Sequence, residues 1–426
     1  MLSRNLTDIS RSLVTLSRPG YRMTETGEIP EEWDILPLTK VAKYINGMAF
    51  KPSDWKKQGI PIVRIENLND SSAPFNYFDE EVDNKFLLND GDILLSWSAS
   101  LGVYIWNRGK AVLNQHIFKV VPNETVNKYY LFWALHNSVE TLSKVTHGST
   151  MKHFQKGELE RTKIALPSLS EQQKIAEILF TADETIQKVN EEITLTEKLK
   201  KGLMQTLLTK GIGHTKFKMT EIGEIPEEWE ISKLDKIFNI FTGTTPSTKI
   251  RKYWHNGSIE WLTPKDLGRM ADSIFISSSE KKITPDALKE CSLNLIPKGS
   301  ILISTRAPVG YVGVSKTKIT FNQGCKGLVP IELNNIDTSF YAYYLAYKRS
   351  ILVSKSSGST FKELSKESLA NFDVPVPPLP EQQKIAEILT TVDHKLELLR
   401  NKKTHLERLK KGLMEDLLTG RVRVKI

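Results

Sequence analysis

The sequence contains the same framework twice, and this duplication constrains the fold more than any other feature. Three blocks recur almost unchanged: MTETGEIPEEW at 23–33 as MTEIGEIPEEW at 219–229, EQQKIAEIL at 171–179 and again at 381–389, and KLKKGLMQTLLT at 198–209 as RLKKGLMEDLLT at 408–419. The offset is 196 residues for the first block and 210 for the other two. A period this long excludes a solenoid of 20–50-residue units. The sequence therefore predicts one two-part module, a globular domain followed by a helix, present twice.

Each helical segment carries a heptad seam, in which apolar residues alternate by four and three positions. The seam positions are Ile175, Leu179, Ala182, Ile186, Val189 and Ile193, and then Ile385, Leu389, Val392, Leu396, Leu399 and Leu406. The first run is expected to continue through Leu199, Leu203 and Leu207, up to Gly211 and Gly213. With Ser170 as the first cap, each helix should span about 38 residues, or about 57 Å. We expect the two helices to pair antiparallel; the alternative is that each packs only on its own domain.

The globular segments mix short apolar runs with helical patterns. Runs at 93–95, 103–105 and 301–303 predict strands, and 128–142 and 338–353 predict helices. We expect an α+β fold with two globular α/β domains, separated by long antiparallel coiled-coil helices and related by a pseudo-twofold repeat. The expected borders are 1–21 for a poorly ordered leader, 22–170 and 214–380 for the globular domains, and 171–213 and 381–426 for the helices.

Composition excludes several classes of protein. The chain has 426 residues, 39% of them hydrophobic and 26% charged, which excludes a wholly disordered chain. Cys291 and Cys325 cannot form a CxxC pair or a four-ligand zinc site, so no metal is expected. No uncharged apolar stretch approaches the ~20 residues needed to span a bilayer, and we expect a soluble, cytoplasmic protein. The net charge of +9 indicates a nucleic-acid partner only weakly.

No catalytic motif is present. The sequence lacks a phosphate-binding GxxxxGK[ST] loop, a GxGxxG turn, an HExxH pair and an Asn-Pro-Pro-aromatic tetrapeptide. Pro285-Asp286 is better explained as a helix start than as part of a nuclease site, because no acidic-x-Lys follows. Trp33 and Trp229, which end the GEIPEEW blocks, are expected to pack structurally. Together with the duplication, the missing motifs favour a binding protein over an enzyme.

Polar side chains in the globular segments are of the types that contact DNA. The loop at 242–254 mixes hydroxyls, cations and aromatics, and 50–57 holds the corresponding place in the first copy. Asn114-Gln115 and Asn322-Gln323 are adenine-reading types, and Arg306 is a guanine-reading type. An ordinary surface loop, or an amide that stabilises a turn, explains any one of these residues equally well.

These motifs resemble the specificity subunit of type I restriction-modification enzymes, especially its archaeal and thermophilic members. GEIPEEW opens each half, PSLSEQQKIAEIL and PPLPEQQKIAEIL open the helices, and KGLM followed by LLT closes them. FTGTTPST, IEWLTPKDL and STRAPVG are similar to one common type of target-recognition domain. The resemblance covers residues 22–426.

The resemblance implies a non-catalytic chain in which each target-recognition domain reads one half of a bipartite, asymmetric DNA target. It implies that the helices set the spacer and dock two methyltransferase (modification) subunits, with restriction subunits completing the complex. S-adenosylmethionine, ATP and Mg are then expected on the partner subunits and not on this chain. The alternative from a different class is a non-enzymatic coiled-coil scaffold with paired protein- or carbohydrate-binding domains.

The same matches predict individual site residues. The expected DNA contacts are Lys51, Ser53, Arg64, Asn67, Trp97, Asn114, Gln115 and Lys152 in the first domain, and Thr245, Ser247, Lys249, Lys252, Lys265, Arg306, Asn322, Gln323 and Lys362 in the second. The expected partner-binding helix residues are Ile175, Leu179, Ile186, Val189, Ile193, Ile385, Leu389, Leu396 and Leu399. Residues that both copies share, the Asn-Gln pairs above all, could be framework, because identical residues cannot distinguish two different half-sites.

Overall fold

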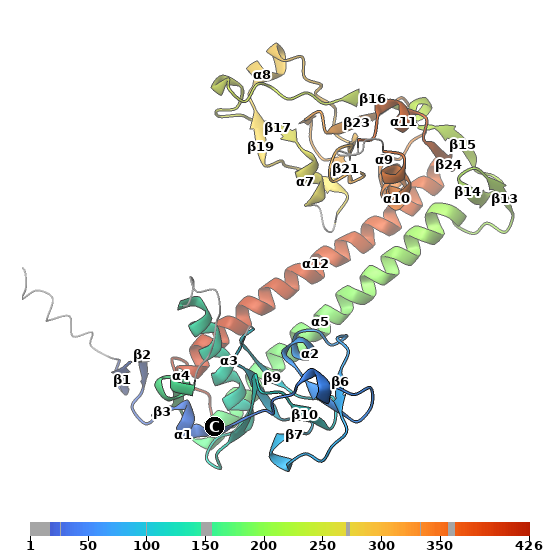
Figure 1. Cartoon of the computed structure of the whole chain (residues 1–426). Helices are drawn as coiled ribbons and strands as arrows, with labels where there is room; N and C mark the ends of the chain where they lie inside the picture. The colour runs from blue at the N-terminus through green and yellow to red at the C-terminus, as the bar shows by residue number, and fades with distance from the viewer. Residues whose placement is uncertain are drawn as a thin grey trace, which may run out of the picture. The chain divides into compact units, whose positions relative to one another are not determined.

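The computed structural model describes residues 18–25, 27–98, 100–145, 156–269, 273–332, 334–356 and 363–426, and it divides into two compact units (Figure 1). The first unit comprises 1–187 and 405–426, and the second comprises 188–404. These borders differ from the expected domain borders because each long helix contributes one part to each unit. Of the expected leader, only its last four residues are among those described.

The two long helices are α5 (Leu169–Lys210) and α12 (Leu379–Leu418), with 42 and 40 residues. Ser170 lies inside α5, and the capping residue is Ser168 instead, whose Oγ accepts a hydrogen bond from the Glu171 amide at 3.4 Å. Gly211 and Gly420 follow the helices with φ of +65° and +69°, a left-handed conformation that favours glycine. The predicted stop at Gly211 is therefore confirmed.

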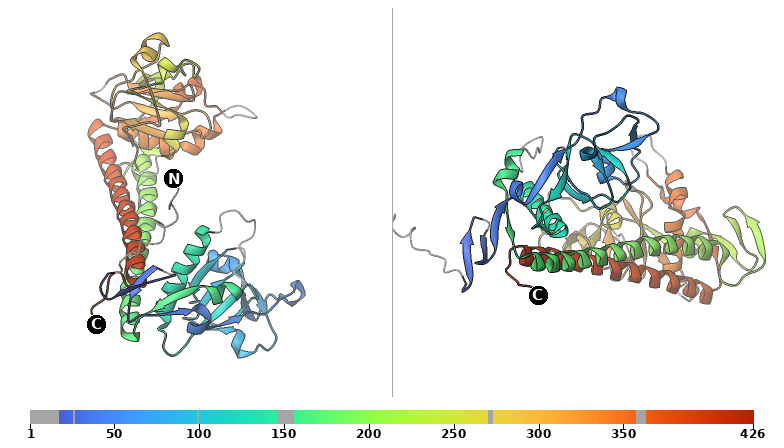
Figure 2. Two further views of the ribbon diagram at one scale, coloured as in Figure 1. Left: turned by 90° about the vertical axis from the view of Figure 1, so that its left-hand side faces the viewer. Right: turned by 90° about the horizontal axis from the view of Figure 1, so that it is seen from below.

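Polar contacts show that α5 and α12 run antiparallel within each unit, and the views of Figure 2 show them side by side. The contacts between the helices are Asp183–Lys410 in the first unit, and Asn190–Lys403, Glu197–Arg400 and Lys200–Asp393 in the second. In the first unit Glu171 also pairs with Arg423, which follows α12. Partner numbers fall along one segment as they rise along the other, as antiparallel pairing requires. The predicted helix pair is confirmed.

The first unit contains, before α5, eighteen short elements among the described residues. They are β1 (Tyr21–Thr24), β2 (Gly27–Pro30), β3 (Asp34–Pro37), α1 (Leu38–Val41), β4 (Ala42–Asn46), η2 (Pro52–Asp54), β5 (Ile60–Val63), α2 (Ile65–Asn69), β6 (Asn76–Phe78), η3 (Asn84–Phe86), β7 (Leu87–Leu88), β8 (Ile93–Ser96), β9 (Gly102–Ile105), β10 (Ala111–Leu113), β11 (Ile117–Pro122), α3 (Lys128–Val145), α4 (Lys156–Arg161) and β12 (Lys163–Leu166).

The second unit has an equivalent series of nineteen elements, among the described residues, between α5 and α12. Its elements are β13 (Phe217–Thr220), β14 (Gly223–Pro226), β15 (Glu230–Lys233), α6 (Leu234–Ile237), β16 (Phe238–Thr242), η4 (Arg251–Tyr253), β17 (Ile259–Leu262), α7 (Pro264–Gly268), β18 (Phe275–Ile276), β19 (Lys281–Ile283), α8 (Pro285–Glu290), β20 (Ile301–Ser304), β21 (Val312–Ser315), β22 (Thr320–Phe321), β23 (Cys325–Pro330), α9 (Thr338–Tyr347), α10 (Arg349–Ser354), α11 (Lys366–Ala370) and β24 (Asp373–Val376).

The two units share one sheet topology, which confirms the α+β prediction. The main sheet has the order β4-β11-β8-β9 in the first unit and β16-β23-β20-β21 in the second, where β18 adds a fifth strand beside β21. A smaller sheet follows in each, β6-β5-β10-β7 and β19-β17-β22. The predicted strands at 93–95, 103–105 and 301–303 are β8, β9 and β20. The single helix predicted at 338–353 is broken at Lys348 into α9 and α10.

The repeated GEIPEEW block docks on the first turn of each long helix. Trp33 is 1% exposed, and its Nε1 donates to Glu171 Oε2 at 3.1 Å. Trp229 is fully buried and donates to Glu381 Oε2 at 2.9 Å. Both tryptophans pack in the core of their units, as expected from the sequence. Because this contact recurs with the same partners, it explains why the two blocks have hardly diverged.

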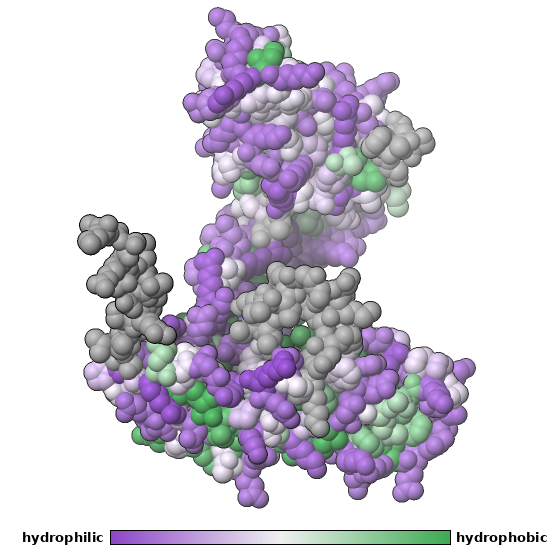
Figure 3. Space-filling view, turned by 60° about the vertical axis from the view of Figure 1, so that its left-hand side comes forward, coloured by the Kyte–Doolittle hydropathy of each residue, from purple (hydrophilic) through white to green (hydrophobic). Residues whose placement is uncertain are grey.

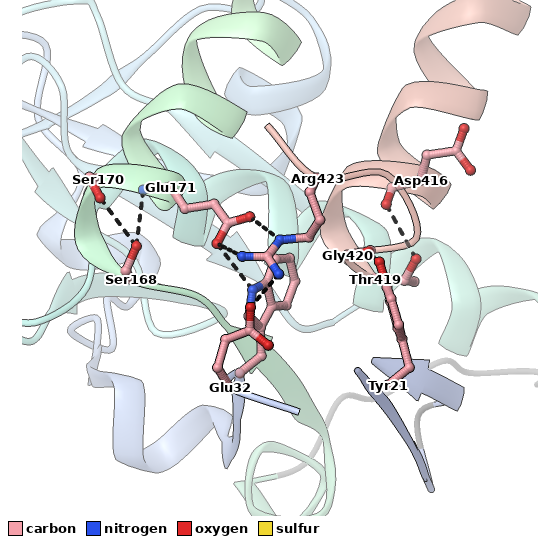
Figure 4. A network of polar contacts seen from close by, with 10 residues as sticks. Tyr21, Glu32, Ser168, Ser170, Glu171, Asp416, Thr419, Gly420 and Arg423 are labelled. Atoms are coloured by element: carbon pink, nitrogen blue, oxygen red, sulfur yellow. Dashed lines mark hydrogen bonds and ion pairs between the residues drawn. The ribbon is translucent and has the colours of Figure 1, made fainter. Parts of the chain in front are cut away.

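The chain's last residues close the first unit (Figure 4). Arg423 Nε donates to Glu171 Oε1 at 2.7 Å, and a second guanidinium nitrogen pairs with Glu32. The hydroxyl of Tyr21 donates to the Gly420 carbonyl at 2.9 Å. The buried Glu171 carboxylate is therefore satisfied by one residue from each end of the chain, Trp33 and Arg423.

Candidate nucleic-acid interface

In each unit the most divergent loop leaves the main sheet at a glycine that packs against a repeated turn. A Cβ on Gly47 would lie 2.1 Å from the Asn114 carbonyl oxygen, and one on Gly243 would lie 2.0 Å from that of Asn322. No side chain fits there, so both loops start from the same fixed point. The loops at 47–57 and 243–254 diverge only beyond this point.

Asn114 and Asn322 form that turn. Asn322 Oδ1 accepts a hydrogen bond from the backbone amide of Gly324 at 3.0 Å. In the equivalent place, Asn114 Oδ1 accepts one from the backbone amide of His116 at 3.4 Å. Both asparagines therefore stabilise a turn that the two copies share. This is the framework role that the sequence allowed as an alternative to base reading. The glutamines that follow differ in their partners: Gln323 bonds the Thr245 hydroxyl, whereas Gln115 Nε2 lies 3.4 Å from His116 Nε2.

The predicted residues at the start of the first loop are exposed and ordered by one carboxylate. The Lys51 amide donates to Asp54 Oδ2 at 2.7 Å, and the Ser53 hydroxyl donates to Asp54 Oδ1 at 3.1 Å. The Lys51 amide also holds the pKa of Asp54 below its usual value. The Lys51 ammonium and the Ser53 hydroxyl lie on the surface, where a phosphate can reach them.

Arg64 and Asn67 follow β5 and differ in what they offer. The Arg64 guanidinium lies 5.1 Å from the ring centre of Trp55, a side chain that is 40% exposed, and pairs with Glu66. Asn67 is fully buried; its Oδ1 accepts the Arg64 amide, and its Nδ2 donates to two loop carbonyls at 3.2 Å each. Asn67 therefore stabilises the turn with its side-chain amide buried, and its contact with DNA stays a prediction.

Trp97 stands in a small aromatic cluster after β8. Its Nε1 donates to Asn46 Oδ1 at 3.2 Å, and its ring centre lies 5.4 Å from that of His116 and 5.9 Å from that of Phe118. Trp97 is half-buried and His116 is exposed. Lys152, the remaining prediction in this unit, lies outside the described residues.

In the second unit two tryptophans fasten the longer loop. Trp254 Nε1 donates to the Ser247 carbonyl at 3.1 Å, and Trp261 Nε1 donates to the Thr244 carbonyl at 3.0 Å. The two rings meet edge to face with centres 4.9 Å apart. Thr245, Ser247 and Lys249 are thus presented on a loop tied down at two points, and not on a free chain.

Two predicted lysines of the second unit are held in surface ion pairs. Lys252 lies 2.7 Å from Glu290, and Lys265 lies 3.2 Å from Glu280. The hydrogen bond from Lys252 lowers the pKa of Glu290, and that from Lys265 lowers the pKa of Glu280. Exposed pairs of this kind contribute little to stability, so a phosphate can compete for either ammonium group.

A basic hollow of about 610 Å³ lies beside this loop and was missed by the sequence prediction. It is lined by Thr248, Lys249, Arg251, Trp254, His255, Glu280, Lys281 and Lys282. Within the described part of the chain, Lys249, Arg251 and Lys281 form no ion pair. The alternation of cations and aromatics in KIRKYWH at 249–255 was the available signal. Figure 3 shows one face of the molecule, on which the described surface of the second unit is mainly hydrophilic.

Arg306 follows β20 and is half-exposed. Its Nε lies 3.1 Å from Glu363 Oε2, a partner that the sequence prediction did not include. Glu363 is distant in sequence and becomes a neighbour only because the segment before α11 returns to this edge of the sheet. Lys362, the adjacent prediction, lies outside the described residues.

The family comparison agrees with this repeated geometry. The family model described as the type I restriction modification DNA specificity domain matches residues 30–197 and 226–408, one match for each copy. The chain belongs to this family. The MjaVIII specificity subunit of a type I restriction enzyme of Methanocaldococcus jannaschii is 31% identical over 413 residues, which cover 93% of this chain and 94% of the relative.

Two further likenesses are of different kinds. The MjaIX specificity subunit of the same organism is 44% identical, but over 204 residues that cover 47% of this chain and 45% of that protein. A crystal structure of the S subunit of a type I restriction-modification system from M. genitalium superposes with a TM-score of 0.58 over 93% of this chain and 98% of that one. Its sequence identity of 15% makes this a likeness of fold alone.

The seam residues predicted to bind partners are used inside this member of the specificity family. All nine are buried or half-buried: Ile175, Leu179, Ile186, Val189, Ile193, Ile385, Leu389, Leu396 and Leu399. They therefore hold each unit together, and their contact with partner subunits stays a prediction. The predicted continuation of the seam through Leu199 is wrong, because that side chain is 55% exposed. Leu169, Leu195, Leu398 and Leu409 are the other large apolar side chains exposed on the described parts of α5 and α12.

The described residues contain no group of three or more His, Cys, Asp or Glu side chains arranged to hold a metal ion. No described helix is both long enough and apolar enough to cross a membrane.

Proposed function

We propose that this chain is the DNA specificity subunit of a type I restriction-modification complex, in which each unit reads one half of a bipartite target. The observation that carries the proposal is the pair of equivalent surfaces: a common glycine-and-asparagine turn in each unit supports loops of different chemistry. The relatives are named as specificity subunits of type I restriction enzymes, which favours this function over a protein- or carbohydrate-binding scaffold.

The long helices are proposed to set the spacer between the half-sites and to dock the modification subunits. α5 is one continuous helix of 42 residues, about 63 Å at 1.5 Å per residue, which suits a fixed spacer better than a tether does. Two modification subunits fit the twofold repetition of the sequence, and restriction subunits complete the complex. S-adenosylmethionine, ATP and Mg are proposed to bind those partners, and the cytoplasm is the proposed compartment.

The test is a methylome. The full chain is co-expressed with a type I adenine methyltransferase subunit from the same genome, and methylated adenines are mapped across the host genome. We expect one asymmetric motif of two short specific parts separated by a nonspecific spacer. Methylation without such a motif, or none when both proteins are present and folded, would overturn the proposal.

Salt dependence separates the proposal from the scaffold alternative. Neutralising DNA phosphates releases counterions, so log K for duplex binding by the complex should fall linearly with log salt. A scaffold for proteins or sugars would show no duplex binding above that of an unrelated protein of the same net charge.

A further inference from the structure

At one equivalent position the two units carry opposite chemistry. Directly after β8 the first copy has Trp97-Ser98, whereas directly after β20 the second copy has Arg306 in the place of Ser98. On the neighbouring strand, Phe118 of β11 pairs with the last residue of β4, and Lys326 of β23 pairs with the last residue of β16. The first unit therefore has an aromatic cluster where the second has a charged one.

Arg306 is held on one side only. Glu363 Oε2 lies 3.1 Å from its Nε, and the arginine side chain is 48% exposed. Neither Nη atom forms a hydrogen bond or an ion pair with another of the residues that the structure describes. Because the Glu363 carboxylate lies beside Nε, the two Nη atoms are left as a fork that a ligand with two acceptors can approach.

Lys326 makes the surroundings of this fork positive. Its side chain is 5% exposed on a central strand, and burial lowers its pKa while the nearby Glu363 opposes that shift. Arg306 and Lys366 are the other cations that act on Lys326. One carboxylate among three cations favours hydrogen-bond acceptors at this place and disfavours the amino groups of adenine and cytosine.

We propose that Arg306 reads a guanine of the second unit's half-site through O6 and N7, with Glu363 as its positioning residue. This inference rests on the proposed function. Guanine presents two adjacent acceptors in the major groove, which match a bidentate guanidinium fork. Ser98 cannot make this contact, so the first unit reads the equivalent base pair of its own half-site differently.

The experiment maps methylation by the full complex carrying Arg306→Ala, Arg306→Lys or Glu363→Gln. Arg421→Ala is the matched control, because Arg421 Nε also contacts a carboxylate, Asp416, and its side chain is 54% exposed in the first unit. Thermal unfolding of each variant confirms that it folds. The wild-type complex is the reference: if it yields no bipartite motif, the proposed function fails, whereas a wild-type motif makes the Arg306 result decisive.

We expect Arg306→Ala to reduce discrimination for guanine at one position of one half-site by about 5- to 100-fold, with every other position unchanged. Arg306→Lys should relax the same position, because lysine keeps the charge but lacks the fork. Glu363→Gln should relax it less, and Arg421→Ala should leave the motif intact. An unchanged motif in Arg306→Ala overturns the proposal. So does a uniform loss over all sequences with a flatter salt slope, which marks a phosphate contact.

Discussion

The two units differ most where their loops begin to diverge and least where those loops are attached. Trp33 and Trp229 make the same bond to the first turn of a long helix, and Asn114 and Asn322 form the same turn. Beyond that turn, one unit exposes an aromatic cluster and the other a set of cations. This contrast shows how recognition can change while the fold stays fixed, because the residues that hold each loop are not the residues that face outward.

Exchange of the globular part of the second unit should change the methylated motif more than any other alteration. β15 and β24 pair with each other and so mark natural borders, which makes the stretch from Glu230 to Val376 the piece to replace with that of a relative. One half of the methylated motif should then change completely and the other should stay as it was. Methylome sequencing decides the matter, and a change in both halves would mean that the units do not read independently.

A paired insertion should change the distance between half-sites without changing either. Seven residues added after Gln187 in α5 and after Thr404 in α12 keep the apolar phase and lengthen both helices by about 10 Å. The preferred spacer should grow by about three base pairs at ~3.4 Å each. The matched control adds four residues to α5 alone. This insertion puts the heptad seam of α5 out of phase with that of α12 and should destabilise the helix pair. The preferred spacer is measured by methylation of targets with graded spacers. An unchanged spacer after the paired insertion would contradict the proposal that the helices set the distance between the half-sites.

The repeated tryptophan bond can be compared by the same substitution in both copies. Trp33→Phe and Trp229→Phe each keep an aromatic ring but remove the donor to a carboxylate, at a cost of about 1–3 kcal/mol in unfolding free energy. The cost should be larger for Trp33, because its partner Glu171 is 2% exposed and Glu381 is 12% exposed. Urea unfolding measures both values. A larger loss at Trp229 would show that burial of the carboxylate does not control the cost.

The smallest expected effect is on the pH dependence of stability, and it involves two equivalent ion pairs, Asp393–Lys200 and Asp183–Lys410. Burial raises the pKa of Asp393, opposed by Lys200, and its side chain is 4% exposed against 42% for the equivalent Asp183. A carboxyl group with a raised pKa in the folded state holds its proton more tightly there than when unfolded. Its contribution to stability is therefore greatest below the ordinary pKa of about 4 and is lost as the pH rises through the raised value.

Asp393→Asn should accordingly flatten the dependence of the second unit's stability on pH above about 4. Asp183→Asn is the control in the first unit and should alter that dependence less. Amide exchange of each unit in the full chain, measured at several pH values, separates the two. Equal slopes for wild type and Asp393→Asn would show that Asp393 does not contribute.

The sequence was sufficient for the fold because the duplication and the heptad seam are both periodic signals. The repeat predicted paired modules, and the seam predicted an antiparallel helix pair whose buried positions, such as Leu179 and Leu389, are those expected. Single positions were less secure, because Leu199 fits the spacing but faces solvent. The break at Lys348 was also missed, since α9 and α10 share one apolar pattern.

For the candidate nucleic-acid interface, the sequence predicted which loops take part but not which partners their side chains have. Residue type suggested Arg306, but its partner Glu363 lies 57 positions away and is brought near by the fold. Asn67 has a side chain of the type that reads bases, but its amide group forms hydrogen bonds within its own turn. The basic hollow around Trp254 combines two segments, 248–255 and 280–282, that no local pattern connects.

The closure of the first unit by Arg423 has a consequence for synthesis on the ribosome. The second unit is one uninterrupted stretch, 188–404, and all of it is made before residues 405–426. The first unit needs 405–426, so the domain that is made first is the last to be completed. The apolar surface of the first unit must be kept from aggregating until residues 405–426 have been made. A nonsense codon within 405–426 would therefore damage recognition by the first unit, although the codon lies more than 200 residues after its globular part.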